Sequence, residues 1–236
     1  MEIRNPPSAI RNYDWLPFLL QTADALFPTG AYAHSLGFEE IVRLGMVRDE
    51  STLRDFLFTQ VMPAQERLEL PYLRFAFEAR DLVERCALDR EIDAWKLPRE
   101  TREASAQLGG RRLKALCAMV EAPELEEFAD AIAAGRASGH HLVVFALQAR
   151  AGGIPLPAAL SAWLYQSLAA ACAASLKLIR IGQDGCQRVL RAASADAPAV
   201  IERSREVPRA DAGWFNPMLE IASMRHASAN ERLFIS

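Results

Sequence analysis

The sequence predicts an all-α fold: a single-domain helical bundle of roughly ten helices around a central apolar helix. Apolar residues recur at helical spacing along nearly the whole chain, and the alternation typical of strands is almost absent. Prolines and glycines interrupt this pattern where helices are expected to begin and end. The segment 158–178 is apolar on all sides, which is typical of a buried helix. With 236 residues, one domain can hold a substantial core.

The chain is expected to begin with a flexible leader, residues 1–15, followed by the helical domain, residues 16–226. An apolar helix starts near Pro17, and the turn 27–35 is built on Pro28 and Gly30. Further helices are predicted over 36–44 with Gly45 as the stop, from Ser51 or Thr52 to Pro63, through 70–77 with a kink at Pro71, and from a cap at Asp89 to about Leu97.

Helices in the second half are expected to start at prolines or polar caps and to stop at glycines. They are predicted from Pro98 to about 120, from Pro123 to Gly135, over 140–150, from Pro157 to about 181, over 184–193, after a cap at Asp196, and from Asn216–Pro217 to 226.

The apolar segment 158–178 is nearly long enough to cross a membrane, which takes about 20 residues. Polar side chains interrupt it, namely Ser161, Tyr165, Gln166, Ser167, Ser175 and Lys177. Small residues fill its middle, 169–174, and they allow neighbouring helices to approach closely. We therefore expect a central helix of a bundle and no membrane span.

Composition favours a protein of the reducing cytoplasm. The net charge of −3 gives no overall field that would attract nucleic acid, and the basic run at Arg111, Arg112 and Lys114 is interpreted as a solvated helix face. The N-terminus has no apolar stretch of signal-peptide length. Four cysteines in apolar helical contexts are expected to be reduced structural thiols, namely Cys86, Cys117, Cys172 and Cys186.

Catalytic signatures are missing from the sequence. It has no phosphate-binding loop, no dinucleotide fingerprint and no nucleophile elbow. His34 and Ser35, with Asp24 as orienter, would suit a hydrolase, but adjacent side chains do not face each other. The pair His140–His141 lacks the spacing that puts two ligands on one helix face, so no metal site and no cofactor are expected.

Four segments in order resemble the UreF family of urease accessory proteins. They are residues 19–40 (LLQTADALFPTGAYAHSLGFEE), 101–113 (TREASAQLGGRRL), 175–190 (SLKLIRIGQDGCQRVL) and 224–236 (MRHASANERLFIS), called here the first to fourth family-like segments. The resemblance spans positions 16–236. Ala227 stands where the family usually has Glu, and Ser161 stands where some relatives carry Arg.

The resemblance implies an all-α, non-catalytic assembly protein that tends to form dimers. It implies binding to UreD, called UreH in some species, and recruitment of the GTPase UreG. This assembly would couple GTP hydrolysis to nickel insertion into apo-urease. Two alternatives stay open: a helical hydrolase-type enzyme using His34 and Ser35, and a direct nickel carrier.

The resemblance also marks thirteen residues for partner binding. They are Tyr32, His34, Ser35, Tyr165, Lys177, Gln183, Asp184, Gln187, Arg225, His226, Arg232, Leu233 and Phe234.

Residue chemistry leaves the surroundings of these residues open. The tail 227–236 is expected to order on a partner, and the alternative is packing against its own bundle. The turn 27–35 either exposes Tyr32 and His34 or packs inward. Lys177 either reaches a partner or a carboxylate, or extends along the helix surface to water.

Overall fold

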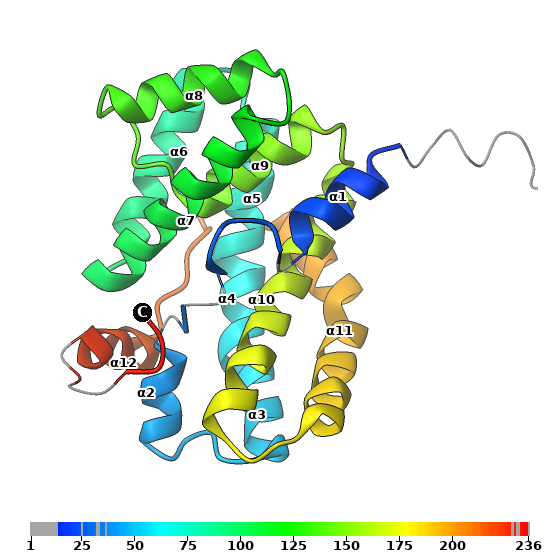
Figure 1. Ribbon diagram of the computed structural model, residues 1–236, viewed down its shortest axis with the longest axis vertical. Helices are drawn as coiled ribbons and strands as arrows, with labels where there is room; N and C mark the ends of the chain where they lie inside the picture. Colours follow the sequence, from blue (N-terminus) through cyan, green and yellow to red (C-terminus); the bar gives the residue numbers. More distant parts are fainter. Residues whose placement is uncertain are drawn as a thin grey trace, which may run out of the picture.

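The computed structural model describes residues 14–24, 26–31, 34–35, 37–227, 229 and 232–235, and every regular element in these ranges is helical (Figure 1). In chain order the elements are α1 (Leu16–Ala23), α2 (Phe38–Arg43), α3 (Glu50–Phe56), η3 (Leu57–Val61), α4 (Met62–Ala64), η4 (Gln65–Glu69), α5 (Leu70–Glu78), α6 (Leu82–Trp95), α7 (Arg99–Cys117), α8 (Pro123–Ala133), α9 (His141–Ala151), α10 (Leu156–Leu178), α11 (Gln183–Glu206) and α12 (Pro217–Ala227). The all-α prediction is confirmed. Ten helices lie in the described ranges when the uninterrupted stretch α3–α5 counts as one.

One helix runs without a break from Glu50 to Glu78, so the predicted stop at Pro63 is wrong. Two π-helical turns, η3 and η4, each end two residues before a proline, Pro63 and Pro71. The residue before each proline donates its backbone N–H to the carbonyl five positions back. Proline lacks an N–H, and its ring crowds the carbonyl four residues earlier. The wider π turns accommodate both effects inside a packed helix.

The α3–α5 helix runs the length of the molecule and organises the other helices around it (Figure 1). Helices α6 to α9 gather at its α5 end, and α10 and α11 lie side by side along its α3 end. Helix α12 packs on α2 and α7. This places the C-terminal segment at the junction of the two groups.

Helix α10 packs against α5, α9 and α11 with Leu160, Leu164 and Leu168 buried, which supports its assignment as a core helix. By length and composition alone it could also cross a membrane. One side of α10 stays exposed, so it is less enclosed than its all-round apolar character predicted. The most completely buried helix is α9, in which every residue from Leu142 to Ala149 is buried.

Two predicted helix boundaries are wrong. Asp89 lies inside α6 and caps a different helix: its carboxylate accepts the backbone N–H groups of Ser138 and His140, at 2.6 and 2.7 Å, before α9. Helix α11 continues through Pro198 instead of dividing in two. Tertiary contacts decide the position of Asp89. The predicted cap at Asn216 is confirmed, since its side chain accepts the N–H groups one turn into α12.

Candidate partner-binding site

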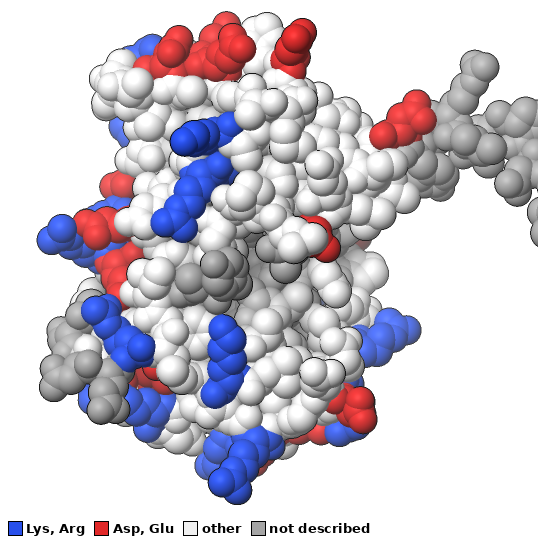
Figure 2. All heavy atoms as spheres, in the orientation of Figure 1, with Lys and Arg blue, Asp and Glu red and all other residues white. Residues whose placement is uncertain are grey.

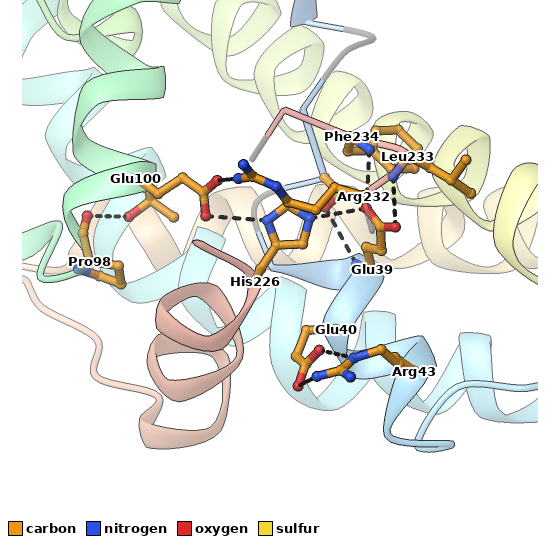
Figure 3. A network of polar contacts seen from close by, with 11 residues as sticks. Glu39, Glu40, Arg43, Pro98, Glu100, His226, Arg232, Leu233 and Phe234 are labelled. Atoms are coloured by element: carbon orange, nitrogen blue, oxygen red, sulfur yellow. Dashed lines mark hydrogen bonds and ion pairs between the residues drawn. The ribbon is translucent and has the colours of Figure 1, made fainter. Parts of the chain in front are cut away.

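Residues far apart in the sequence meet where α2, α7 and α12 come together, and the C-terminal tail crosses this junction (Figure 3). We call these residues the tail cluster. They are Glu39, Glu100, Lys177, His226, Arg232, Leu233 and Phe234.

The Glu39 carboxylate is the centre of the tail cluster. It accepts the backbone N–H of Leu233 at 2.9 Å and that of Phe234 at 3.1 Å, one on each oxygen. A ring nitrogen of His226 lies 3.0 Å from the second oxygen. Burial alone would raise the pKa of Glu39, but these hydrogen bonds outweigh it and the pKa is lowered overall. The ionised carboxylate therefore holds the tail.

The start of α2 must lie close to α12 for this arrangement. Gly37, with a φ of +88°, precedes α2, and a Cβ there would come within 2.4 Å of the Ser223 side-chain oxygen. A glycine fits both the left-handed backbone and the close approach. The sequence Gly37-Phe38-Glu39 therefore brings Glu39 against the last turn of α12.

His226 bridges two carboxylates from different helices. Its Nε2 lies 3.0 Å from Glu39, and its Nδ1 lies 3.2 Å from Glu100 on α7. Carboxylates only accept hydrogen bonds, so a ring with hydrogen on both nitrogens makes both contacts at once. Glu100 also pairs with Arg232 at 3.1 Å. The His226 side chain is nearly fully buried, so this bridge ties α2, α7 and the tail to α12.

Of the described tail residues 232–235, only Phe234 is buried. Phe234 is 5% exposed, and the Lys177 ammonium of α10 lies 5.1 Å from the centre of its ring. Leu233 and Ile235 on either side are 70% and 60% exposed. Beside the tail, an open groove of about 760 Å³ is lined by residues that include Val42, Arg43 and Leu178.

A second group of charges joins α2 to α12 beneath the tail. The Glu40 side chain is fully buried and pairs with Arg43 at 2.8 Å and with Arg225 at 2.9 Å. The hydrogen bonds from Arg43 come first among the causes that lower the pKa of Glu40, and the charge of Arg225 adds to them. On the short helix α2, Glu39 therefore holds the tail, and the adjacent Glu40 holds Arg225 of α12.

Arg112, on α7, organises the segment between α1 and α2. Its guanidinium donates to the Thr22 carbonyl at 3.2 Å, to His141 Nε2 at 2.9 Å and to the side chain of Gln148. It also lies over the Phe27 ring at 5.1 Å. Its solvated-face interpretation is wrong, because Arg112 is 2% exposed and desolvation lowers its pKa to about 9. Neutral acceptors and aromatic faces satisfy the buried cation.

Comparison with known proteins assigns the family. A UreF family model matches residues 47–194. The chain is 38% identical over 218 residues to the urease accessory protein UreF of Arthrobacter sp. (strain FB24), covering 92% of this chain and 96% of that protein. The chain belongs to the UreF family. The UreF of Paenarthrobacter aurescens (strain TC1) is 39% identical with the same coverage, and that of Actinobacillus pleuropneumoniae is 32% identical over 224 residues, 92% and 97% of the two chains.

The segments that carry the UreF resemblance meet in space. The first, third and fourth family-like segments contribute Glu39, Lys177 and His226 to the tail cluster. The first and second meet where Arg112 holds Thr22. Folding therefore converts four separated UreF motifs into one connected region.

Not all of the residues marked by the resemblance lie in this region. The tail cluster contains Lys177, His226, Arg232, Leu233 and Phe234. Arg225 lies beside the cluster, where it pairs with Glu40. Tyr165 is exposed on α10. Three more lie exposed on the first turns of α11, namely Gln183, Asp184 and Gln187.

Of the described residues in the turn 27–35, Phe27, Thr29 and His34 are buried, and His34 is 8% exposed. The Ser35 hydroxyl accepts the Glu39 backbone N–H at 3.4 Å, so it helps to start α2. Tyr32 lies outside the described residues. Within the described residues, no group of three His, Cys, Asp or Glu side chains could hold a metal ion.

Four charged residues in and around the tail cluster were not predicted from the sequence: Glu39, Glu40, Glu100 and Arg112. A signal for two of them was present, because the first family-like segment ends in adjacent glutamates at the start of a short helix. Glu100 lies just before the second family-like segment, and Arg112 lies within it but was interpreted as part of a solvated face, because charged residues on a long helix usually face water.

Proposed function

We propose that this UreF-family protein is a urease accessory protein that acts without catalysis of its own. In this proposal it binds UreD, or UreH, and the UreG GTPase, and the assembly couples GTP hydrolysis to nickel insertion into apo-urease. The names of the relatives support the urease role, and the match extends over 92% of this chain and 96% of the first relative. We further propose a cytoplasmic homodimer that binds neither nucleic acid nor membranes.

The tail cluster is the observation that carries this proposal. The tail exposes Leu233, which lines an open groove, and Ile235, although Phe234 between them is buried. Exposed aliphatic side chains this close together are typical of a protein interface. Figure 2 shows this face: Asp and Glu gather at the end formed by α8, and Lys and Arg lie over the middle and the opposite end. A partner that covers the tail would meet mostly basic side chains.

Co-purification with UreD and UreG, with and without GTP and magnesium, tests the proposal. Replacing Leu233 and Ile235 together by Asp should weaken UreD binding by about tenfold or more, because buried anchors dominate interface energies. Val83→Asp is the matched control, since Val83 is an aliphatic residue on α6 that is 75% exposed. Unchanged UreD binding by the double variant, or no UreD binding by the wild type, would contradict the proposal.

A further inference from the structure

Two cysteine side chains meet where α10 and α11 pack together. Cys172 lies on α10, Cys186 lies in the first turn of α11, and both thiols are free. The Cys186 thiol donates to the backbone carbonyl of Cys172, with 3.3 Å between sulfur and oxygen. Burial comes first among the causes that raise the pKa of Cys172 to about 12, and the Cys186 thiol adds to it through its charge and a hydrogen bond. The two thiols, called here the thiol pair, are therefore neighbours in space.

The bond from Cys186 is not needed to satisfy the carbonyl of Cys172. The hydroxyl of Ser175 donates to the same oxygen at 2.6 Å. A thiol is a weak donor, so its hydrogen bond adds little. Two neighbouring sulfur atoms, unlike other small side chains, can form a covalent bond with each other. The position of the pair therefore points to thiol chemistry.

The thiol pair is closed to solvent in the folded chain. Cys172 is 1% exposed, and Cys186 is 4% exposed. On the outer side of α11, Arg188 pairs with Glu50 of α3 at 2.6 Å, which helps to hold the first turns of α11 in place. An oxidant therefore reaches the two sulfurs only when the start of α11 opens, and an exposed thiol such as Cys117 reacts earlier.

We propose that Cys172 and Cys186 form a redox-sensitive clasp: a small-molecule disulfide oxidises them, and the new sulfur–sulfur bond ties α10 to α11. Cys186 reacts first because it lies at the helix end that opens. Its thiolate attacks one sulfur of the oxidant, breaks that S–S bond and releases a thiolate, which takes up a proton. The Cys172 thiolate then attacks the Sγ of Cys186 and displaces the second thiol. Two electrons and the two cysteine protons thus pass to the oxidant, which leaves as two thiols.

The new bond closes a loop that contains the turn 179–182 between the two helices. A cross-link restricts the unfolded chain and so stabilises the folded one. It also prevents the opening at the start of α11 through which the oxidant entered. Oxidation therefore locks this end of the helix pair, and a thiol reductant releases it. The clasp uses residues of this chain alone, so it does not rest on the proposed function.

Peptide mapping of the full-length protein after incubation with oxidised glutathione tests the clasp. A Cys117→Ser background removes the exposed thiol. The main product should be a peptide pair joined through Cys172 and Cys186, lighter than its reduced form by two hydrogen atoms, and dithiothreitol should reverse it. Thiols that stay reduced, separate glutathione adducts on the two cysteines, or a link from either one to Cys86 would overturn the proposal.

Two further variants keep the result specific to the folded chain. Cys186→Ser should abolish the linked product. Cys86→Ser is the matched control and should leave the product unchanged, since Cys86 is also buried but lies on α6. A link that forms in urea and is absent from the folded protein would contradict the clasp, because random encounters in an unfolded chain would then explain it.

Hydrogen exchange and thermal unfolding test the lock. In the oxidised protein, the backbone amides of residues 186–190 should exchange at least about tenfold more slowly than in the reduced protein, because the opening of α11 is blocked. The thermal midpoint should rise by about 5 °C, as expected for closing a loop of this size in a chain of this length. Equal exchange in the two forms, or a lower midpoint in the oxidised form, would show that the bond strains the helix pair and does not lock it.

Discussion

The backbone N–H of Gly213 donates to the carbonyl of Arg67 at 2.9 Å. Arg67 lies four residues before Pro71, so its carbonyl lacks the usual helical donor. The segment between α11 and α12 supplies that donor. The proline in the middle of a long helix thus creates the point where the connection to α12 attaches.

Gly213→Ala should destabilise the protein by about 1–3 kcal/mol, the usual cost of overpacking. A Cβ at this position would lie 2.5 Å from the Trp95 ring. Gly110→Ala is the control: no atom lies within 4 Å of its Cβ, and helix propensity should stabilise it by about 0.5–1 kcal/mol. Urea unfolding measures both changes. A Gly213→Ala protein as stable as the wild type would show that Trp95 moves aside at no cost.

Arg112→Met should cost about 2–4 kcal/mol, because it leaves buried acceptors on Thr22, Gln148 and His141 without their donor. Arg112→Lys should not restore the stability, because an ammonium cannot reach three acceptors with the planar geometry of a guanidinium. Arg111→Lys serves as the control, since Arg111 is exposed and, among the described residues, bonds to the Thr29 carbonyl at 3.4 Å. Thermal unfolding of the three variants measures the order of their stabilities. Recovery of wild-type stability with Lys would show that only the charge matters.

Docking of the tail should weaken in acid. The pKa of Glu39 in the folded protein lies below its ordinary value of 4.5, so the unfolded carboxyl binds a proton more readily. The contribution of Glu39 to stability is therefore complete above pH 4.5 and is lost as the pH falls through the lower pKa of the folded state. The difference in thermal midpoint between the wild type and Glu39→Gln should shrink over this range. A difference that grows toward acid pH would contradict this sign.

Cys117 should be the most reactive cysteine of the native protein. It is exposed, whereas Cys86, Cys172 and Cys186 are buried, and burial with the neighbouring Cys186 raises the pKa of Cys172 to about 12. Desolvation also raises the pKa of the Cys117 thiol, so the difference in exposure decides, and a brief alkylation at mildly alkaline pH should label Cys117 first. Mass spectrometry locates the label, and Cys117→Ser should remove it. Comparable native labelling of Cys172 would indicate that α10 and α11 separate.

The helix boundaries show how far local signals reach. Pro98, Pro123 and Asn216 were recognised as helix starts because capping depends on the next few residues only. Pro63 was misjudged because a neighbouring π turn relieves its crowding. Asp89 was recognised as a cap, but its partner is 51 positions away at His140, a distance that no local pattern records.

The sequence by itself determined the helical class, the single domain and the UreF family, because periodicity and ordered motifs are properties of the chain. Only the tertiary structure decided which charged residues are buried and what they hold. Glu39 and Arg112 look like surface charges in the sequence, and each is enclosed by donors or acceptors from distant parts of the chain. A charge can be buried only where folding brings its hydrogen-bond partners together, and these partners come from separate segments of the chain.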